Sequence, residues 1–284
     1  MKRYKLLNNV LGWVVFVIAA VTYILTLEST ASFWDCGEFI ASGYKLEVGH
    51  PPGNPIFMLT ARFFANFASS PSEVAYMVNL MSGLLSAATI LLLFWTITRL
   101  AQKIVLREGE TEETMSLGQM IAILGCGLVG ALAYAWSDTF WFSAVEGEVY
   151  AYSSFCTALV FWLILKWESV ADLPHANRYI ILIAYIIGVS IAVHLLNLLC
   201  IPAIVLVYYY RKYKNTDLKG SLIALLVSFV LIVLLLYGLV PGFVEVASWV
   251  ELLFVNVFHL PFNSGVVFYF FLIVGVIAWA IYET

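Results

Sequence analysis

Charge is the scarcest property of this 284-residue sequence. Asp, Glu, Lys and Arg together make up 11% of the residues, whereas a soluble domain carries about 25%. Hydrophobic residues account for 63% of the chain, and the mean hydropathy is +0.95. This composition excludes a soluble globular protein and indicates a polytopic membrane protein.

Cysteine is scarce as well, with four residues and no Cys-x-x-Cys pair. Cys126, Cys156 and Cys200 lie inside apolar runs, where cysteine acts as a small buried hydrophobe. Cys36 lies in a polar stretch but has no neighbouring cysteine that would complete a disulfide or a metal site. Basic tracts and alternating basic and aromatic residues are also absent, which argues against a nucleic-acid partner.

Long apolar runs are abundant, and a membrane-spanning helix needs about 20 such residues. The first run follows three basic residues and resembles a secretory signal, but its length favours an uncleaved span. A longer run over 179–210, with Asn197 and Pro202 near its middle, favours a hairpin of two short helices. The fold prediction is therefore an all-α bundle of about 7–8 spans, forming a single transmembrane domain over 1–284. The predicted spans are 9–28, 74–100, 117–136, 150–167, 179–195, 197–210, 220–240 and 264–282.

The few charges are distributed unevenly between the two ends of the predicted spans. With the hairpin, nearly all basic residues fall on one side, and the positive-inside rule makes that side cytoplasmic, together with the N-terminus. The acidic residues concentrate in the other breaks, mainly an opening loop at about 29–73 and a second loop at about 137–149. Both loops are therefore predicted to be external, and the first is expected to carry short juxtamembrane helices.

The opening loop holds most of the polar chemistry, in the stretch FWDCGEFIASGYKLEVGHPPGNP. If a helix begins near Ser32 and is capped by it, Asp35 and Glu38 lie three residues apart on one face. One interpretation is purely structural, because acids in the first turn of a helix interact favourably with the helix dipole. A carboxylate held at the membrane surface by flanking aromatic residues is partly desolvated, however, which raises its basicity and suits general-base catalysis. Both interpretations stay open at this point.

A proline-rich turn closes this stretch. Pro51, Pro52 and Pro55 cannot continue a helix and predict a rigid corner. The corner either only joins two helices or, with His50 and Asn54 as its polar side chains, holds an anionic or sugar ligand in a fixed geometry.

Two further polar groups interrupt apolar surroundings. Glu146 and Glu148 flank a glycine in the second loop, within FWFSAVEGEVYAY. They belong either to a solvated loop or to an external cavity shared with the first-loop acids. His194 and Asn197, near the tip of the predicted hairpin, lie three residues apart. Since polar groups at membrane depth are costly, they are expected to contact a ligand or a neighbouring helix.

Taken together, these features resemble the GT-C superfamily of membrane glycosyltransferases. The stretch WDCGEFIASGYKLEVGHPPGNPIF is similar to the D-x-G-E…H-P-P-G-x-P motif of a protein O-mannosyltransferase-related family found in animals and Bacteroidetes, and FWFSAVEGEVYAY is similar to its second external motif. The resemblance implies that Asp35 is the first-loop catalytic acid with Glu38 beside it, and that Glu146 or Glu148 is the second-loop acid. Family members continue with further spans and a large soluble region, so the chain is expected to be the N-terminal part of a longer protein.

The resulting hypothesis is an inverting transfer of a sugar, expected to be mannose, from a polyprenyl-phosphate donor to a Ser or Thr hydroxyl of an exported polypeptide. Asp35 is the expected general base, while His50, Arg62 and His194 are expected near the leaving phosphate. The expected partners are the lipid-linked sugar, the acceptor polypeptide and membrane lipid. No cofactor is required, although a divalent cation on Asp35, Glu146 or Glu148 is compatible with the residues. The expected location is a bacterial inner membrane with the site facing the periplasm.

Two alternatives belong to other functional classes. One is a transporter or flippase that uses the external acids for coupling, although the paired repeats typical of transporters are not visible. The other is a non-catalytic membrane subunit that presents a binding surface within a complex.

Overall fold

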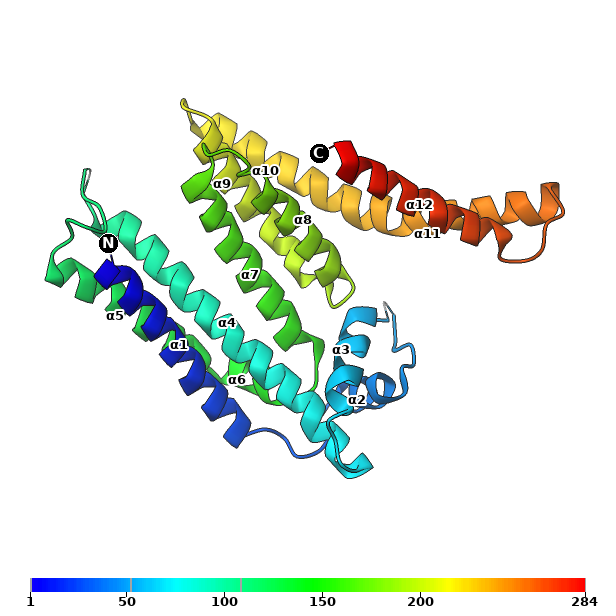
Figure 1. Cartoon of the computed structure of the whole chain (residues 1–284), viewed down its shortest axis with the longest axis horizontal. Coiled ribbons are helices and arrows are strands. Elements are labelled where there is room, and N and C mark those ends of the chain that lie inside the picture. Colours follow the sequence, from blue (N-terminus) through cyan, green and yellow to red (C-terminus); the bar gives the residue numbers. More distant parts are fainter. Residues whose placement is uncertain (1, 52, 108, 284) are drawn as a thin grey trace. The chain divides into compact units, whose positions relative to one another are not determined.

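Helices make up most of the computed structural model, which describes residues 2–51, 53–107 and 109–283 (Figure 1). No β-strand occurs in these three ranges, so the all-α prediction is confirmed. Within the same ranges, 7 helical stretches are long and apolar enough to cross a membrane, in agreement with the predicted number of about 7–8. The chain divides into two compact units, Met1–Thr216 and Asp217–Thr284, which are described separately below.

The long helices of the first unit are α1 (Lys2–Leu25), α4 (Val74–Val105), α5 (Leu117–Ala135) and α7 (Val149–Val170). Helix α4 packs against the other three and forms the centre of this unit (Figure 1).

Lipid tails are as apolar as these side chains, so close backbone packing rather than the hydrophobic effect holds such helices together. At Gly127 of α5, a Cβ atom would lie 2.5 Å from the Thr98 Cγ2 atom of α4, which shows how near the two helices approach. The phenol of Tyr23 in α1 donates a hydrogen bond of 2.9 Å to the Ala135 carbonyl at the end of α5. These contacts fix one end of α1 against the α4–α5 pair.

The run at 179–210 forms two helices, as predicted. Helix α8 (Arg178–Ile191) ends before residues 192–194, and the 3₁₀ turn η2 (Leu195–Cys200) leads into α9 (Ile201–Lys212). Pro202 lies in the first turn of α9, where its missing N–H group costs no helical hydrogen bond. Asn197 falls in the 3₁₀ turn rather than in either α-helix.

The opening loop contains two short α-helices, α2 (Cys36–Lys45) and α3 (Pro55–Ala65), followed by the 3₁₀ turn η1 (Pro71–Glu73). The prediction that α2 begins near Ser32 is wrong. Trp34 has a φ of 57°, in the left-handed region, so the helical path starts only at Cys36 with Asp35 at the N-cap position. Gly43 allows α2 to lie on α3, because a Cβ atom there would be 2.8 Å from the Ala61 Cβ atom.

The second loop also contains a helix, α6 (Asp138–Val145), followed directly by the Glu146–Gly147–Glu148 segment. This short helix packs against α4, and the backbone N–H of Glu28 donates to the Val145 carbonyl at 3.1 Å. The end of the second loop is thereby joined to the start of the first.

The second unit corrects the predicted break at 241–263. Helix α10 (Leu218–Val233), the π-helical segment η3 (Leu234–Leu239), α11 (Val240–Leu252) and the π-helical segment η4 (Leu253–Val257) run on without interruption. Pro241 has no N–H group to donate the backbone hydrogen bond of an α-helical turn. The wider π-helical turn before it accommodates the proline, so the helix continues. The break is therefore confined to residues 258–263, after which α12 (Ser264–Glu283) begins.

Helix α12 packs against α11 through Gly265, where a Cβ atom would lie 2.5 Å from the Glu251 Cα atom. The Glu251 carboxylate accepts hydrogen bonds from the backbone N–H groups of Asn263 at 2.6 Å and Val266 at 3.0 Å. These bonds satisfy two of the amide donors that a helix leaves free at its N-terminus.

Candidate active site

The first-loop acids and the histidine of the proline-rich turn form one cluster. The Glu38 Oε1 atom accepts a hydrogen bond of 2.6 Å from the backbone N–H of His50, and Oε2 lies 3.2 Å from the imidazole Nδ1 atom. One donor atom each from Asp35, Glu38 and His50 lies within 4.8 Å of the other two. All three side chains are exposed, so a molecule at the surface can reach them.

Local backbone geometry places His50 on Glu38. Helix α2 ends with Leu46 in the left-handed conformation at a φ of 56°, and this reverses the chain toward the start of the helix. The backbone N–H of Gly53 donates to the His50 carbonyl at 2.8 Å, and Pro55 opens α3. The predicted turn is therefore confirmed for its described members, while Pro52 lies outside the described residues.

Hydrogen bonding to the charged form lowers the pKa of Glu38. The His50 backbone N–H makes the largest contribution and the His50 side chain the second. Glu38 is therefore held as a carboxylate that orients the imidazole.

The second-loop acids lie in the interior beside this cluster. The side chains of Glu146 and Glu148 are buried, with 3% and 5% of their surface exposed. The Glu148 carboxylate accepts a hydrogen bond from the Asp35 backbone and lies close enough to Asp35 and His50 for both to affect its ionisation. The structure thus brings the acids of both loops to one place.

Burial changes the ionisation of this pair. Desolvation, reinforced by the negative charges of Glu146 and Asp35, raises the pKa of Glu148 to about 7. Desolvation also raises the pKa of Glu146, against a lowering by a hydrogen bond from the Ser32 side chain. The Oε2 atom of Glu146 is buried without a hydrogen-bond partner among the described residues. A carboxyl group with a pKa near 7 can hold or release a proton at neutral pH.

Gly147 makes this burial possible. A Cβ atom at residue 147 would lie 2.9 Å from both the Asn79 Oδ1 atom and the Val78 Cγ1 atom of α4, and 3.2 Å from the Ile40 Cγ1 atom of α2. Only a residue without a side chain lets the second loop pass between these two helices. The glycine therefore sets the position of both neighbouring acids.

Asn79 is a positioning residue that the sequence interpretation missed. It is fully buried in α4, and its Nδ2 atom donates to the backbone carbonyls of Glu28 at 2.7 Å and Thr30 at 3.1 Å. These bonds fix the chain that leads from α1 into Asp35. An amide within a predicted span was the signal that could have found it, since such groups need a partner there.

Two other predicted site residues, His194 and Asn54, lie where the turn after α8 meets the first loop and the start of α7. The His194 ring lies 5.5 Å from the Tyr150 ring, two residues beyond Glu148, and its Nδ1 atom accepts a hydrogen bond of 3.1 Å from the Leu196 N–H. Burial lowers the pKa of His194. Asn54 is buried at the start of α3, where the neighbouring Ile56 N–H donates to the Ala192 carbonyl at 3.1 Å. The hairpin tip therefore borders the first loop.

Asn197 and Arg62 lie farther away. Asn197 is buried and its Oδ1 atom accepts a hydrogen bond of 3.4 Å from the Thr157 hydroxyl, a helix–helix contact. Arg62 donates to the Tyr44 carbonyl at 2.5 Å and stacks on the Tyr44 ring, in the last turn of α2. Tyr44 lies nine positions after Asp35, roughly 13 Å along the helix. The structure does not bring Arg62 to the acids.

The donor atoms suit proton transfer and also a hard cation. Carboxylate oxygens are the ligands that divalent cations such as Mg²⁺ prefer. The group with suitable spacing is Asp35, Glu38 and His50. The buried Glu146 and Glu148 do not belong to that group in the described part of the chain.

The fold and the site define an integral membrane protein of several helical spans. The segments that join α1 to α4 and α5 to α7 combine exposed and buried carboxylates with a histidine. Residues 35–217 match the family described as "Protein O-mannosyl-transferase TMEM260 N-terminal domain". The match covers more than half of the chain, and the chain belongs to this family.

Two curated relatives carry the corresponding name. Protein O-mannosyl-transferase TMEM260 of Mus musculus is 27% identical over 209 residues, which cover 74% of this chain and 27% of the mouse protein. Protein O-mannosyl-transferase tmem260 of Dictyostelium discoideum is 23% identical over 189 residues, 64% of this chain and 20% of that protein. The chain thus spans about a quarter of the length of these relatives. No solved structure matches it.

Proposed function

We propose that this chain contributes the active site of a glycosyltransferase that moves a sugar, by analogy with its relatives mannose, from a polyprenyl-phosphate donor to a Ser or Thr hydroxyl of an exported polypeptide. Two relatives are named as protein O-mannosyl-transferases, and the family match includes both acidic segments. The observation that carries the proposal is the cluster of Asp35, Glu38 and His50, in which Asp35 and His50 lie close enough to the buried Glu148 to affect its ionisation.

Asp35 is the proposed general base. It is the exposed carboxyl group at the start of α2, whereas Glu38 is engaged by His50 and Glu148 is buried beneath it. As the acceptor oxygen attacks the anomeric carbon, its proton passes to Asp35 and a new carbon–oxygen bond forms. The bond from the anomeric carbon to the phosphate oxygen breaks with inversion, and polyprenyl phosphate leaves with the electron pair.

The leaving phosphate needs hydrogen-bond donors or positive charge. His50 is the proposed donor nearest Asp35, because its imidazole lies within the same cluster. His194 borders the second loop and is a further candidate, whereas Arg62 can act only on a ligand that extends along α2. A divalent cation held by Asp35, Glu38 and His50 would supply positive charge at the same place.

The long helix α4 supports a membrane orientation for the site. Asn79 lies beside the acids, and Gln102 lies 23 residues later among basic side chains, a separation of about 35 Å along the helix. The hydrocarbon core of a bilayer is about 30 Å thick. With the basic end cytoplasmic, the acids lie at the external surface, which we propose to be the periplasmic side of a bacterial inner membrane.

The exposed aromatic residues beside the acids suit a lipid-linked donor. Phe33 and Trp34 have 78% and 88% of their surface exposed, directly before Asp35. Aromatic side chains at this depth lie among lipid headgroups and acyl chains. The donor's polyprenyl chain would therefore lie against them while its phosphate reaches the carboxylate cluster.

Substitution of Asp35 by Asn tests the mechanism. Membranes containing the full chain are supplied with radiolabelled polyprenyl-phosphate mannose and a Ser/Thr-rich peptide, and the label in the peptide is counted. We expect a loss of at least about 100-fold, since general-base catalysis contributes 10²–10⁴-fold. Glu47→Gln is the matched control, because Glu47 is an exposed acid of the same loop that pairs with Lys45 at 3.8 Å.

Full transfer by the Asp35→Asn variant, with the variant still folded, would contradict the assignment of the base. Movement of the lipid-linked sugar across liposomes without any transfer to peptide would instead favour the transporter alternative.

A further inference from the structure

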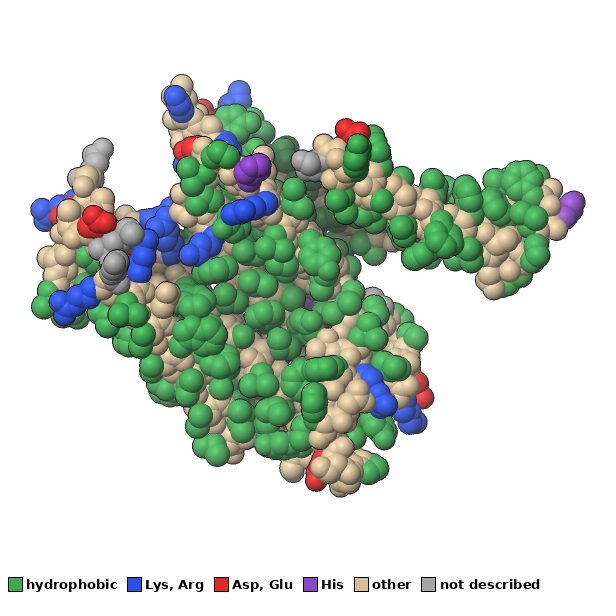
Figure 2. Space-filling model, viewed as in Figure 1, with side chains coloured by type: hydrophobic (Ala, Val, Ile, Leu, Met, Phe, Trp, Pro, Cys, Tyr) green, Lys and Arg blue, Asp and Glu red, His purple; other side chains and the backbone are tan. Residues whose placement is uncertain are grey.

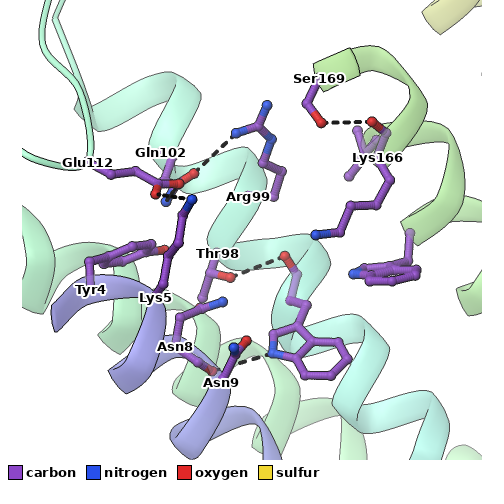
Figure 3. Close-up of a pocket in the computed structure, with 13 residues that line it drawn as sticks. Tyr4, Lys5, Asn8, Asn9, Thr98, Arg99, Gln102, Glu112, Lys166 and Ser169 are labelled. Carbon is purple, nitrogen blue, oxygen red and sulfur yellow. Dashed lines mark hydrogen bonds and ion pairs between the residues drawn. The ribbon is translucent and has the colours of Figure 1, made fainter. Parts of the chain in front are cut away.

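A polar cavity lies at the end of the first unit that is remote from the carboxylate cluster. Its volume is about 470 Å³, and it is bounded by α1, α4, α7 and the segment that follows α4 (Figure 3). It shares no residue with the carboxylate cluster, and the proposed glycosyl transfer does not use it.

The cavity carries an excess of positive charge. Three basic side chains, Lys5, Arg99 and Lys166, line it together with one acidic side chain, Glu112. Figure 2 shows lysine and arginine side chains gathered near the start of α1 and the ends of α4 and α7. With all four groups charged, the lining holds three positive charges against one negative charge.

The single acid is already engaged by the lining. Glu112 pairs with Lys5 at 3.7 Å and accepts a hydrogen bond of 3.4 Å from the buried Gln102 side chain (Figure 3). Arg99 donates to the Gln102 oxygen at 3.4 Å rather than to a carboxylate. Glu112 therefore offsets the charge of Lys5, and no acid of the lining offsets the charges of Arg99 and Lys166.

Lys166 has no carboxylate partner within the described part of the chain. Its ammonium group lies 5.0 Å from the centre of the Trp162 ring. Among these same residues, Lys103 pairs with Glu168 and Arg211 with Asp172, so nearby cations outside the cavity are neutralised. The lining of the cavity thus holds positive charge that has no carboxylate partner among the described residues.

The rest of the lining suits a polar headgroup rather than a free hydrocarbon chain. Asn8 and Asn9 of α1 and Thr98 of α4 contribute polar groups, and the Asn8 Oδ1 atom is buried without a described partner. The rings of Trp95 and Trp162, 6.0 Å apart, form an aromatic wall. Tryptophan at this position is typical of the level of lipid headgroups.

We propose that this cavity binds the phosphate group of an anionic phospholipid from the leaflet opposite the acids. Basic pockets between transmembrane helices on the cytoplasmic side are suited to such headgroups. Arg99 and Lys166 would contact the phosphate, while the asparagine side chains would bind the hydroxyl groups of a headgroup such as glycerol. The same phosphate chemistry could also come from a soluble phosphate compound, and the test separates the two sources.

The test uses native mass spectrometry of the detergent-solubilised full chain, titrated with phosphatidylglycerol or phosphatidylcholine. The double variant Arg99→Gln/Lys166→Gln removes the two uncompensated cations. Each basic residue near an anionic surface contributes about a fivefold change in binding, so the double variant should bind phosphatidylglycerol about 25-fold more weakly. Lys214→Gln/Lys219→Gln removes the same charge from exposed positions outside the cavity and should change binding less than about twofold.

A parallel arm adds inorganic phosphate at millimolar concentration. If it displaces phosphatidylglycerol from the wild-type chain and from the control variant, but not from the residual sites of the cavity variant, the cavity is a phosphate site that a soluble compound can also fill. If the chain shows no preference for phosphatidylglycerol over phosphatidylcholine, or if the cavity variant binds as well as the wild type, the proposal is wrong. Thermal unfolding without lipid shows whether the variant is folded, and Lys166→Arg should retain binding.

Discussion

The buried Glu148 carboxyl group predicts a characteristic dependence of stability on pH. Its pKa is about 7 in the folded protein, against an ordinary value of 4.5, because burial disfavours its charged form. A raised carboxyl pKa means that the folded state binds more protons than the unfolded state between these two values. The contribution of Glu148 to stability is therefore complete below pH 4.5 and decreases as the pH rises to about 7. The full decrease is about 3 kcal/mol, at 1.4 kcal/mol for each unit of pKa difference.

Substitution of Glu148 by Gln removes this titration, and thermal unfolding in detergent at pH 5, 6, 7 and 8 measures the result. The wild-type Tm should fall relative to that of the variant, by a difference on the order of 5–10 °C between pH 5 and pH 8. Burial lowers the pKa of His194, which acts in the opposite direction, so the difference between the two profiles is the informative quantity. Glu146→Gln removes a negative charge that raises the Glu148 pKa, and it should move the midpoint to lower pH.

Glu47→Gln serves as the control, since this exposed acid lies outside the cluster, and its profile should run parallel to that of the wild type. Parallel profiles for Glu148→Gln and wild type would refute the reasoning, because they would mean that Glu148 titrates alike in the folded and unfolded states.

Three other substitutions test the framework around the site. Gly147→Ala places a methyl group 2.9 Å from α4 atoms and should lower the rate of transfer at least about 10-fold. The kcat and KM values with labelled donor measure this effect, and unchanged values would show that the glycine does not position the acids. Asn79→Ala removes two hydrogen bonds to the start of the first loop and should destabilise the protein by about 1–3 kcal/mol. Proteolysis at residues 26–35 should be faster in this variant, and a rate equal to that of the wild type would contradict the role of Asn79. Tyr23→Phe removes the hydrogen bond to the Ala135 carbonyl and should lower the free energy of unfolding by about 1 kcal/mol without affecting transfer. Thermal unfolding measures the first effect, and a loss of transfer would instead place Tyr23 in the catalytic framework.

The spans were predictable because their signal is local: an apolar run of sufficient length needs no information about its neighbours. The prediction failed where local geometry overrides pattern. Pro241 ordinarily ends a helix, yet the π-helical segment before it lets the chain continue to Val257. Ser32 is a good cap by residue type, but the left-handed Trp34 moves the helix start beyond it.

The candidate site was predictable in part for the same reason. Asp35 occupies the N-cap position of α2 and Glu38 lies in its first turn, so their spacing alone indicates that they are neighbours. The contact of Glu38 with His50 depends on the left-handed end of α2, and that of Glu148 with Asp35 joins residues more than 100 positions apart. Neither contact follows from the spacing of the residues in the sequence. Arg62 was expected near the phosphate because it is one of few basic residues in its loop. It belongs to α3 instead and contacts Tyr44 in the last turn of α2, whereas Asp35 lies at the start of α2.

The hydrogen bonds of Glu251 bear on how the second unit enters the membrane. An isolated carboxylate is costly in lipid, and the amide groups that satisfy this one belong to residues 12 and 15 positions later. They become available only when the chain has turned at residues 258–263 and α12 has begun. Helices α11 and α12 are thus suited to leave the translocation channel as one hairpin, whose hydrogen bonds form between segments that are synthesised within seconds of each other.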